Sequence, residues 1–125
     1  MKTNILIIED NEQNMYMLSY LLVKSGYHVI QAFNGVDGLK LAHDHKPEII
    51  LIDIQLPDMD GYEICIKLRH NSIPKNTTII TVTSYAMGGD KEKSLEAGAN
   101  GYIEKPIDPE TFVAKMERIH QTKEK

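Results

Sequence analysis

Acidic side chains directly follow two apolar runs in this sequence. Glu9 and Asp10 come after residues 5–8, and Asp53 comes after residues 49–52. Apolar runs of this length without polar alternation are typical of strands buried on both faces of a parallel sheet. The carboxyl ends of such strands form the edge where α/β proteins bind their ligands. A single aspartate after an apolar run more often just ends a strand, so the remaining strands must show whether this edge is a site.

A divalent cation and a phosphoryl group are the partners that suit these acids. Carboxylates held close together raise each other's pKa unless a cation compensates. A set of oxygen ligands without histidine or cysteine favours Mg²⁺, which keeps several water ligands and is often coordinated by a phosphate as well. Asp53 beside such an ion could attack phosphorus and form an acyl phosphate. Thr83 and Lys105 end two further expected strands, where they would offer a hydroxyl and a positive charge to phosphoryl oxygens.

Five expected strands alternate with five expected helices and position these residues. The strands are expected at residues 5–8, 28–32, 49–53, 78–83 and 102–104, and the helices at 11–24, 36–43, 62–69, 86–97 and from Pro109 onward. Asp108 is expected to cap the last helix. Gly88 and Gly89 predict a loose first turn for the fourth helix. Short loops between alternating elements predict an α/β fold, with a parallel sheet covered by helices on both faces.

Length and charge restrict the class of protein. The 125 residues predict a single domain spanning 1–125. The net charge of −4, without any basic stretch, argues against nucleic acid as the main partner. Cys65 is the one cysteine of the chain and is expected in the core of a protein from a reducing compartment. Without a signal-peptide core or a long apolar run, we expect a cytoplasmic protein that does not enter a membrane.

Four motifs occur in order along essentially the whole chain. They are Ile-Glu-Asp-Asn at 8–11, Leu-Ile-Asp-Ile-Gln-Leu-Pro-Asp-Met-Asp-Gly at 51–61, Val-Thr-Ser at 82–84 and Gly-Tyr-Ile-Glu-Lys-Pro at 101–106. Together they resemble the response-regulator receiver domains of two-component phosphorelays. Ser84 departs from the pattern, because that family more often carries alanine or glycine there. This departure bears on the fit around a phosphoryl group.

The resemblance implies a flavodoxin-like, doubly wound (βα)5 fold with strand order 2-1-3-4-5. It also implies roles for individual residues: Asp53 as phosphoacceptor; Asp10, Asp53 and the backbone carbonyl of Gln55 as Mg²⁺ ligands; Glu9 as a ligand through water; Thr83 and Tyr102 as switch residues; and Lys105, usually followed by a cis proline, as the phosphate-contacting lysine. The phosphoryl donor would be a histidine kinase or a phosphotransfer protein. The fourth helix, fifth strand and fifth helix would bind a downstream protein. Since the chain ends after the last helix, it looks like a single-domain regulator and not an enzyme.

Two other functions are compatible with parts of the pattern. A Mg²⁺-dependent phosphatase with an aspartyl-phosphate intermediate would need a second aspartate two residues after the nucleophile, where this chain has Gln55. A flavin-binding protein of flavodoxin type would need a phosphate loop rich in hydroxyls and glycine after the first strand. Residues 9–12 are instead Glu-Asp-Asn-Glu.

Overall fold

A single parallel sheet forms the centre of the protein. The computed structural model describes residues 2–70, 73–84 and 89–122. The strands are β1 (Asn4–Ile8), β2 (His28–Ala32), β3 (Ile49–Asp53), β4 (Thr78–Thr83) and β5 (Gly101–Glu104). The helices are α1 (Glu12–Lys24), α2 (Gly35–His45), α3 (Gly61–His70), α4 (Asp90–Ala97) and α5 (Phe112–Thr122). All strand pairs are parallel and the order is β2-β1-β3-β4-β5, which confirms the doubly wound, flavodoxin-like prediction.

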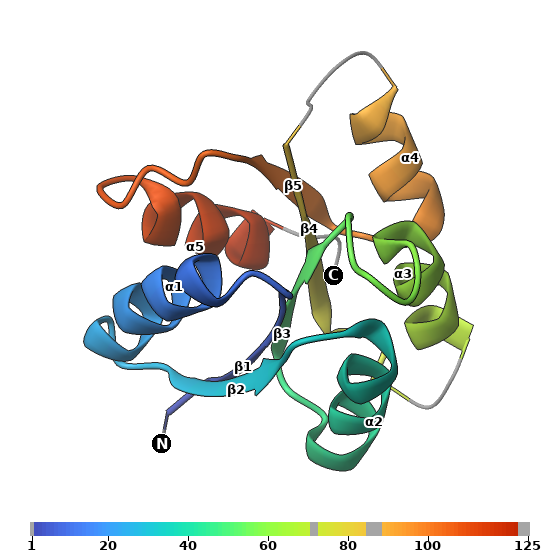
Figure 1. Cartoon of the computed structure of the whole chain (residues 1–125), viewed down its shortest axis with the longest axis horizontal. Helices are drawn as coiled ribbons and strands as arrows, with labels where there is room; N and C mark the ends of the chain where they lie inside the picture. The colour runs from blue at the N-terminus through green and yellow to red at the C-terminus, as the bar shows by residue number, and fades with distance from the viewer. Residues whose placement is uncertain (1, 71–72, 85–88, 123–125) are drawn as a thin grey trace.

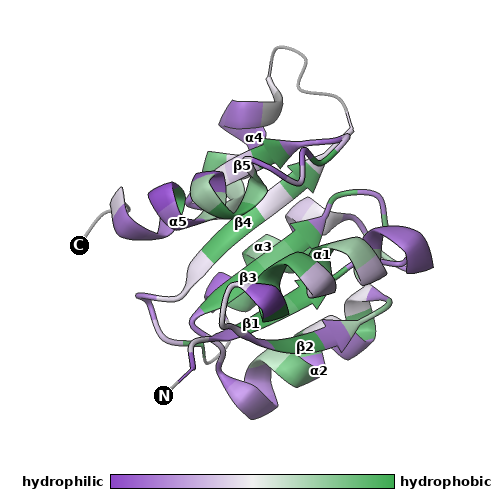
Figure 2. Ribbon diagram, turned by 90° about the vertical axis from the view of Figure 1, so that its left-hand side faces the viewer, coloured by the Kyte–Doolittle hydropathy of each residue, from purple (hydrophilic) through white to green (hydrophobic). Residues whose placement is uncertain are grey.

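Helices cover the sheet on both faces (Figure 1). Helices α1 and α5 pack on one face, and α2, α3 and α4 pack on the other. Successive residues of a strand point to opposite faces, so alternate residues of β1 and β3 enter two separate core clusters. This is why their sequences are uninterrupted apolar runs. Figure 2 shows the same contrast, with largely hydrophobic central strands and hydrophilic stretches on the surrounding helices.

Asparagine side chains cap two helices. Asn11 Oδ1 accepts a hydrogen bond from the backbone of Asn14 at 2.9 Å, and Asn34 Oδ1 accepts one from the backbone of Asp37 at 2.8 Å. Both asparagines have extended backbones and precede the first helical residue. The sequence-based limits of these helices, residues 11–24 and 36–43, are therefore wrong by one residue at each start.

The start of the last helix differs more from the prediction. Asp108 Oδ1 accepts a hydrogen bond from Glu110 N at 3.0 Å, as expected of a cap. However, the Asp108 carbonyl accepts from both Thr111 N and Phe112 N, at 3.1 and 2.9 Å. This closed turn precedes the continuous helix, and α5 begins at Phe112. The prediction that Pro109 is its first residue is wrong by about one turn.

Helix α4 is shorter than the predicted segment. It begins at Asp90, after Gly89 in a left-handed conformation with φ of 107°. Residues 86–88 of the predicted helix lie outside the described residues, so the loose first turn stays a prediction. Within the described part of the chain, the helices are too short and too polar to cross a membrane.

Candidate functional site

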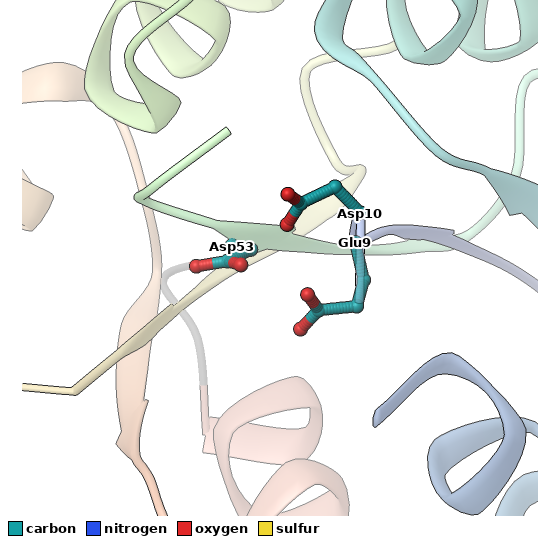
Figure 3. A group of neighbouring side chains, drawn as sticks. All are labelled: Glu9, Asp10 and Asp53. Carbon is teal, nitrogen blue, oxygen red and sulfur yellow. The ribbon is translucent and has the colours of Figure 1, made fainter. Parts of the chain in front are cut away.

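Glu9, Asp10 and Asp53 lie together at the carboxyl ends of β1 and β3 (Figure 3). One carboxylate oxygen from each acid lies within 4.8 Å of the other two. The acids lie together because Ile8 and Ile52 are paired in neighbouring parallel strands, and an acid directly follows each of these two residues. Glu9 and Asp53 are 1% and 5% exposed, whereas Asp10 is exposed. Two buried carboxylates therefore lie beside a third that solvent reaches.

Lys105 joins the two buried acids. Its Nζ lies 3.1 Å from Glu9 Oε1 and 3.2 Å from Asp53 Oδ2. Backbone amides bind the other two oxygens, because Asn11 N donates to Glu9 Oε2 and Gln55 N donates to Asp53 Oδ1, both at 3.0 Å. The contact between Lys105 and Glu9 Oε1 is an ion pair without hydrogen-bond geometry, and this oxygen has no hydrogen-bond donor among the described residues.

The charges of the site affect the protonation of Glu9 and Lys105. The pKa of Glu9 is raised to about 7, mainly by burial. The hydrogen bond from Asn11 N and the Lys105 ammonium lower this pKa, whereas the negative charge of Asp53 raises it. Burial disfavours the Lys105 ammonium, but Asp53 and Glu9 more than offset this effect, so its pKa is raised. One ammonium against three carboxylates leaves the site with excess negative charge, which a cation would stabilise.

An open cleft of about 580 Å³ lies over the acids. Gln55 and the first residues of α1 line it together with Glu9, Asp10, Asp53 and Lys105. The ligands that it offers are oxygens, one of them the buried Glu9 Oε1 without a hydrogen-bond donor among the described residues. These features fit a hard divalent cation such as Mg²⁺.

Thr83 and Tyr102 lie on neighbouring strands but do not line this cleft. Thr83 is 5% exposed at the end of β4, and its carbonyl accepts a hydrogen bond from Lys105 N at 2.7 Å. The Lys105–Pro106 peptide bond is cis, as the resemblance implied. Tyr102 is half-buried on β5 and lines a different cleft. The structure thus brings Glu9, Asp10, Asp53 and Lys105 together, with Thr83 beside them and Tyr102 farther along the sheet.

The loop after β3 contains two residues whose contacts were not predicted. Asp58 accepts hydrogen bonds from Gly35 N at 2.7 Å and Val36 N at 2.9 Å, which lowers its pKa and ties the loop to the start of α2. At Gly61, a Cβ atom would lie 2.6 Å from Ile54 Cα and 2.7 Å from the carbonyl oxygen of Asp53. A glycine is therefore needed where the loop passes the end of β3. The Asp-Met-Asp-Gly sequence was a signal for a turn, but it did not reveal these partners.

The fold and site define a doubly wound α/β domain with an acidic cleft at the carboxyl ends of its strands. Residues 5–117 match the profile of the response regulator receiver domain, so the chain belongs to this family. It is 40% identical over 113 residues to the polar-differentiation response regulator DivK of Brucella anthropi, a match that covers 90% of this chain and 92% of DivK. Receiver domains are signalling modules of two-component systems, and the phosphatase alternative finds no support in these relationships.

Solved receiver structures have the same architecture. The chemotaxis response regulator CheY4 of Vibrio cholerae superimposes with a TM-score of 0.90 at 28% identity, over 95% of this chain and 99% of CheY4. The receiver domain of the sensor histidine kinase PA1611 from Pseudomonas aeruginosa gives 0.87 at 30% identity, over 98% of this chain and 100% of that domain. That structure contains a magnesium ion coordinated in its active site cleft. Receiver domains bind Mg²⁺ at an acidic site, and they interact with kinases or phosphotransfer proteins and with downstream targets.

Proposed function

We propose that this protein receives a phosphoryl group on Asp53 from a histidine kinase or a phosphotransfer protein. The observation that carries the proposal is the position of the Asp53 carboxylate. It is almost fully buried at a strand end, lies 3.2 Å from the Lys105 ammonium and faces an open cleft lined by three further acids, Glu9, Asp10 and Glu12. Lys105 Nζ donates a hydrogen bond to Asp53 Oδ2, whereas its contact with Glu9 Oε1 is an ion pair without hydrogen-bond geometry.

The residues around Asp53 would bind Mg²⁺ and the transferred group. Asp10, Asp53 and the backbone carbonyl of Gln55 would hold the ion, with Glu9 acting through water. The ion would neutralise phosphoryl oxygens during transfer. An oxygen of Asp53 would attack phosphorus as the bond to the donor histidine nitrogen breaks, which leaves an acyl phosphate and a free imidazole. Lys105, which already contacts the carboxylate, would then contact a phosphoryl oxygen.

The new oxygens on Asp53 would change the surface of the protein through Thr83. The Thr83 hydroxyl would turn toward the phosphoryl group and leave space for the Tyr102 ring, which alters the face formed by α4, β5 and α5. A downstream protein would bind this face. Because 92% of DivK is matched, we propose that the chain acts as a single-domain regulator, and that it does so in the cytoplasm with its phosphoryl donor.

Incubation with acetyl phosphate and Mg²⁺, followed by intact-protein mass spectrometry, tests this function. The parent protein should gain the mass of one phosphoryl group, and the label should be labile, as acyl phosphates are. Asp53→Asn should remain unlabelled while its thermal unfolding stays near that of the parent, since an amide has nearly the same shape but is not nucleophilic. Asp44→Asn, a change at an exposed acid on α2, should label normally. Undiminished labelling of Asp53→Asn would place the acceptor at another residue.

A further inference from the structure

Backbone contacts close the base of the loop between β3 and α3. Gly61 N donates a hydrogen bond to the Ile54 carbonyl at 2.9 Å, and Gln55 pairs with Asp60 in a single antiparallel bridge. Residues 56–59 therefore form the tip of a short, hairpin-like loop. Its base carries Gln55, whose backbone carbonyl is a ligand in the proposed Mg²⁺ site.

The Asp58 side chain attaches the tip of this loop to α2. Its two oxygens accept separate hydrogen bonds, Oδ1 from Gly35 N at 2.7 Å and Oδ2 from Val36 N at 2.9 Å. Gly35 and Val36 are the first two residues of α2, and amides at this position have no acceptor within their own helix. Each oxygen of Asp58 thus satisfies an amide that needs an acceptor.

Asp58 and Asn34 stabilise the start of α2 in different ways. The side-chain hydrogen bonds of Asn34 within the described part of the chain are both with Asp37, at 2.8 and 3.1 Å. Asn34 directly precedes α2, so these bonds are local to that helix. Asp58 comes from a distant part of the chain, so its bonds join the helix to the loop after β3.

Apolar packing accompanies this polar attachment. Leu56 and Met59 of the loop are partly buried against the core cluster on the side of the sheet covered by α2, α3 and α4. A Cβ atom at Gly35 would overlap the Met59 side chain, so the loop lies directly on the start of α2. Apolar packing has no preferred direction, whereas hydrogen bonds do. The two bonds of Asp58 therefore determine how the loop is oriented on the helix.

We propose that Asp58 is a positioning residue for the Mg²⁺ site, because its two hydrogen bonds hold the loop so that the Gln55 carbonyl points toward the ion. The inference rests on the proposed function, since it takes this carbonyl as a Mg²⁺ ligand. Mg²⁺ demands a nearly ideal octahedral arrangement, so displacement of one ligand lowers its affinity. Groups that orient metal ligands without touching the ion typically contribute about tenfold or more to metal affinity.

Isothermal titration of Mg²⁺ into three variants of the full chain tests this role. Asp58→Ala removes both hydrogen bonds and should weaken Mg²⁺ binding by about tenfold. Asp58→Asn loses the same charge but keeps an oxygen that can accept from Gly35 N, so it should lose less affinity. Asn34→Ala is the matched control, because it removes the other side-chain cap of α2 and lowers stability, yet it should bind Mg²⁺ like the parent.

Amide hydrogen exchange in EDTA gives a readout that does not depend on the metal. Gly61 N marks the base of the loop through its bond to the Ile54 carbonyl. If Asp58 orients the whole loop, exchange at Gly61 N should be faster in Asp58→Ala than in the parent. It should stay at the parent rate in Asn34→Ala.

Three results would overturn the inference. The first is parent affinity in Asp58→Ala beside a loss in Asp10→Asn, which would leave the proposed metal site intact. The second is equal weakening in Asp58→Ala and Asn34→Ala, since the effect would then follow the stability of α2. The third is an equal loss in Asp58→Ala and Asp58→Asn that disappears as salt rises, because screening identifies an effect of charge.

The same experiments distinguish this inference from the proposed function. If the parent binds Mg²⁺ with the expected dependence on Asp58 but acetyl phosphate leaves Asp53 unlabelled, the positioning role stands and the phosphoacceptor function fails. If Asp53 is labelled and Asp58→Ala binds Mg²⁺ like the parent, the reverse holds. A parent protein without affinity for Mg²⁺ would overturn both the metal site and the role of Asp58.

Discussion

The arrangement of Glu9, Asp53 and Lys105 concentrates charge in a small, buried volume. Two carboxylates share one ammonium at 3.1 and 3.2 Å, and both are nearly inaccessible to water. Such a site is unfavourable for folding unless a proton or a cation neutralises the extra charge. The pKa of Glu9 is raised because protonation of this buried carboxylate removes part of the unfavourable charge. Stability and Mg²⁺ binding should therefore depend on the same few side chains.

The first prediction concerns the pH dependence of stability without Mg²⁺. The pKa of Glu9 is about 7 in the folded protein against 4.5 for an ordinary glutamate. Between these values the folded state keeps a proton that the unfolded chain has lost, so the free energy of unfolding should fall as pH rises from about 4.5 to 7. The loss attributable to Glu9 should be on the order of 1–3 kcal/mol.

Denaturant unfolding in EDTA, measured for the parent and for Glu9→Gln at several pH values, checks this. The variant should gain stability relative to the parent as pH rises, and Mg²⁺ should stabilise the parent more at pH 8 than at pH 5. Parallel pH profiles for the two proteins would show that Glu9 titrates normally.

The second prediction concerns the affinity for Mg²⁺. Asp10 is the exposed member of the three acids, so its replacement should disturb the fold little. Asp10→Asn removes the negative charge and replaces a carboxylate oxygen with a weaker amide oxygen, so it should weaken Mg²⁺ binding by about tenfold or more. Isothermal titration of the variant beside Asp44→Asn, which should match the parent, gives the comparison. Wild-type affinity in Asp10→Asn would contradict the proposed metal site.

Among the elements, α4 is attached to the sheet in an unusual way. In its described part, the side chains of Ser94 and Ala97 are the buried ones, and Leu95 is exposed. The Ser94 hydroxyl lies 2.8 Å from the Thr81 hydroxyl of β4, and both residues are completely buried. Helix α1 buries three large apolar residues instead. A helix with little apolar contact and a specific polar bond is suited to change position.

The third prediction tests this hydroxyl pair. Ser94→Ala leaves the buried Thr81 hydroxyl without this partner and should lower the free energy of unfolding by about 1–3 kcal/mol. Adding Thr81→Val should recover part of the loss, because neither polar group then remains buried alone. A double-mutant cycle from denaturant unfolding gives the coupling energy. Strictly additive effects would mean that the two hydroxyls do not depend on each other.

At the scale of the whole molecule, the acidic cleft and the cleft that Tyr102 lines meet at Lys105, directly after β5. Lys105 lines both clefts, and its backbone amide is hydrogen-bonded to the Thr83 carbonyl. Lys105 thus bonds to Asp53 of β3 and to Thr83 of β4, and it lines a cleft together with Tyr102 of β5. We propose that the signal follows this route. A modification at one end can shift an equilibrium at the other only through contacts that differ between the two states.

The fourth prediction follows from this route. Thr83→Ala should accept a phosphoryl group on Asp53 but lose most of the change that phosphorylation causes at Tyr102. The ring resonances of Tyr102, followed by NMR before and after treatment with acetyl phosphate, provide the readout. Thr111→Ala, a change at an exposed threonine just before α5, is the control and should behave like the parent. An undiminished response in Thr83→Ala would show that the signal reaches Tyr102 by another route.

The residue pattern by itself predicted a parallel α/β sheet and the identity of the acidic cluster, whereas the strand order followed only from the resemblance to a known family. Apolar runs that are followed by Glu9, Asp10 and Asp53 are typical of strands in the middle of a parallel sheet, and parallel pairing then brings the acids together. The four motifs added the family, which the comparisons confirm. The first residue of α5 was harder to predict from the sequence, because turn hydrogen bonds to the Asp108 carbonyl decide where the continuous helix starts.

Tertiary structure alone decided several contacts between polar or charged side chains of different elements. Three features join residues from separate elements. They are the hydroxyl pair of Thr81 and Ser94, the hydrogen bonds of Asp58 with α2, and the basic lining of the cleft that also contains Tyr102. The raised pKa of Glu9 likewise requires the depth of its burial and the exact approach of Asp53. Such properties depend on distances of a few ångströms between elements, and periodicity along the chain does not encode them.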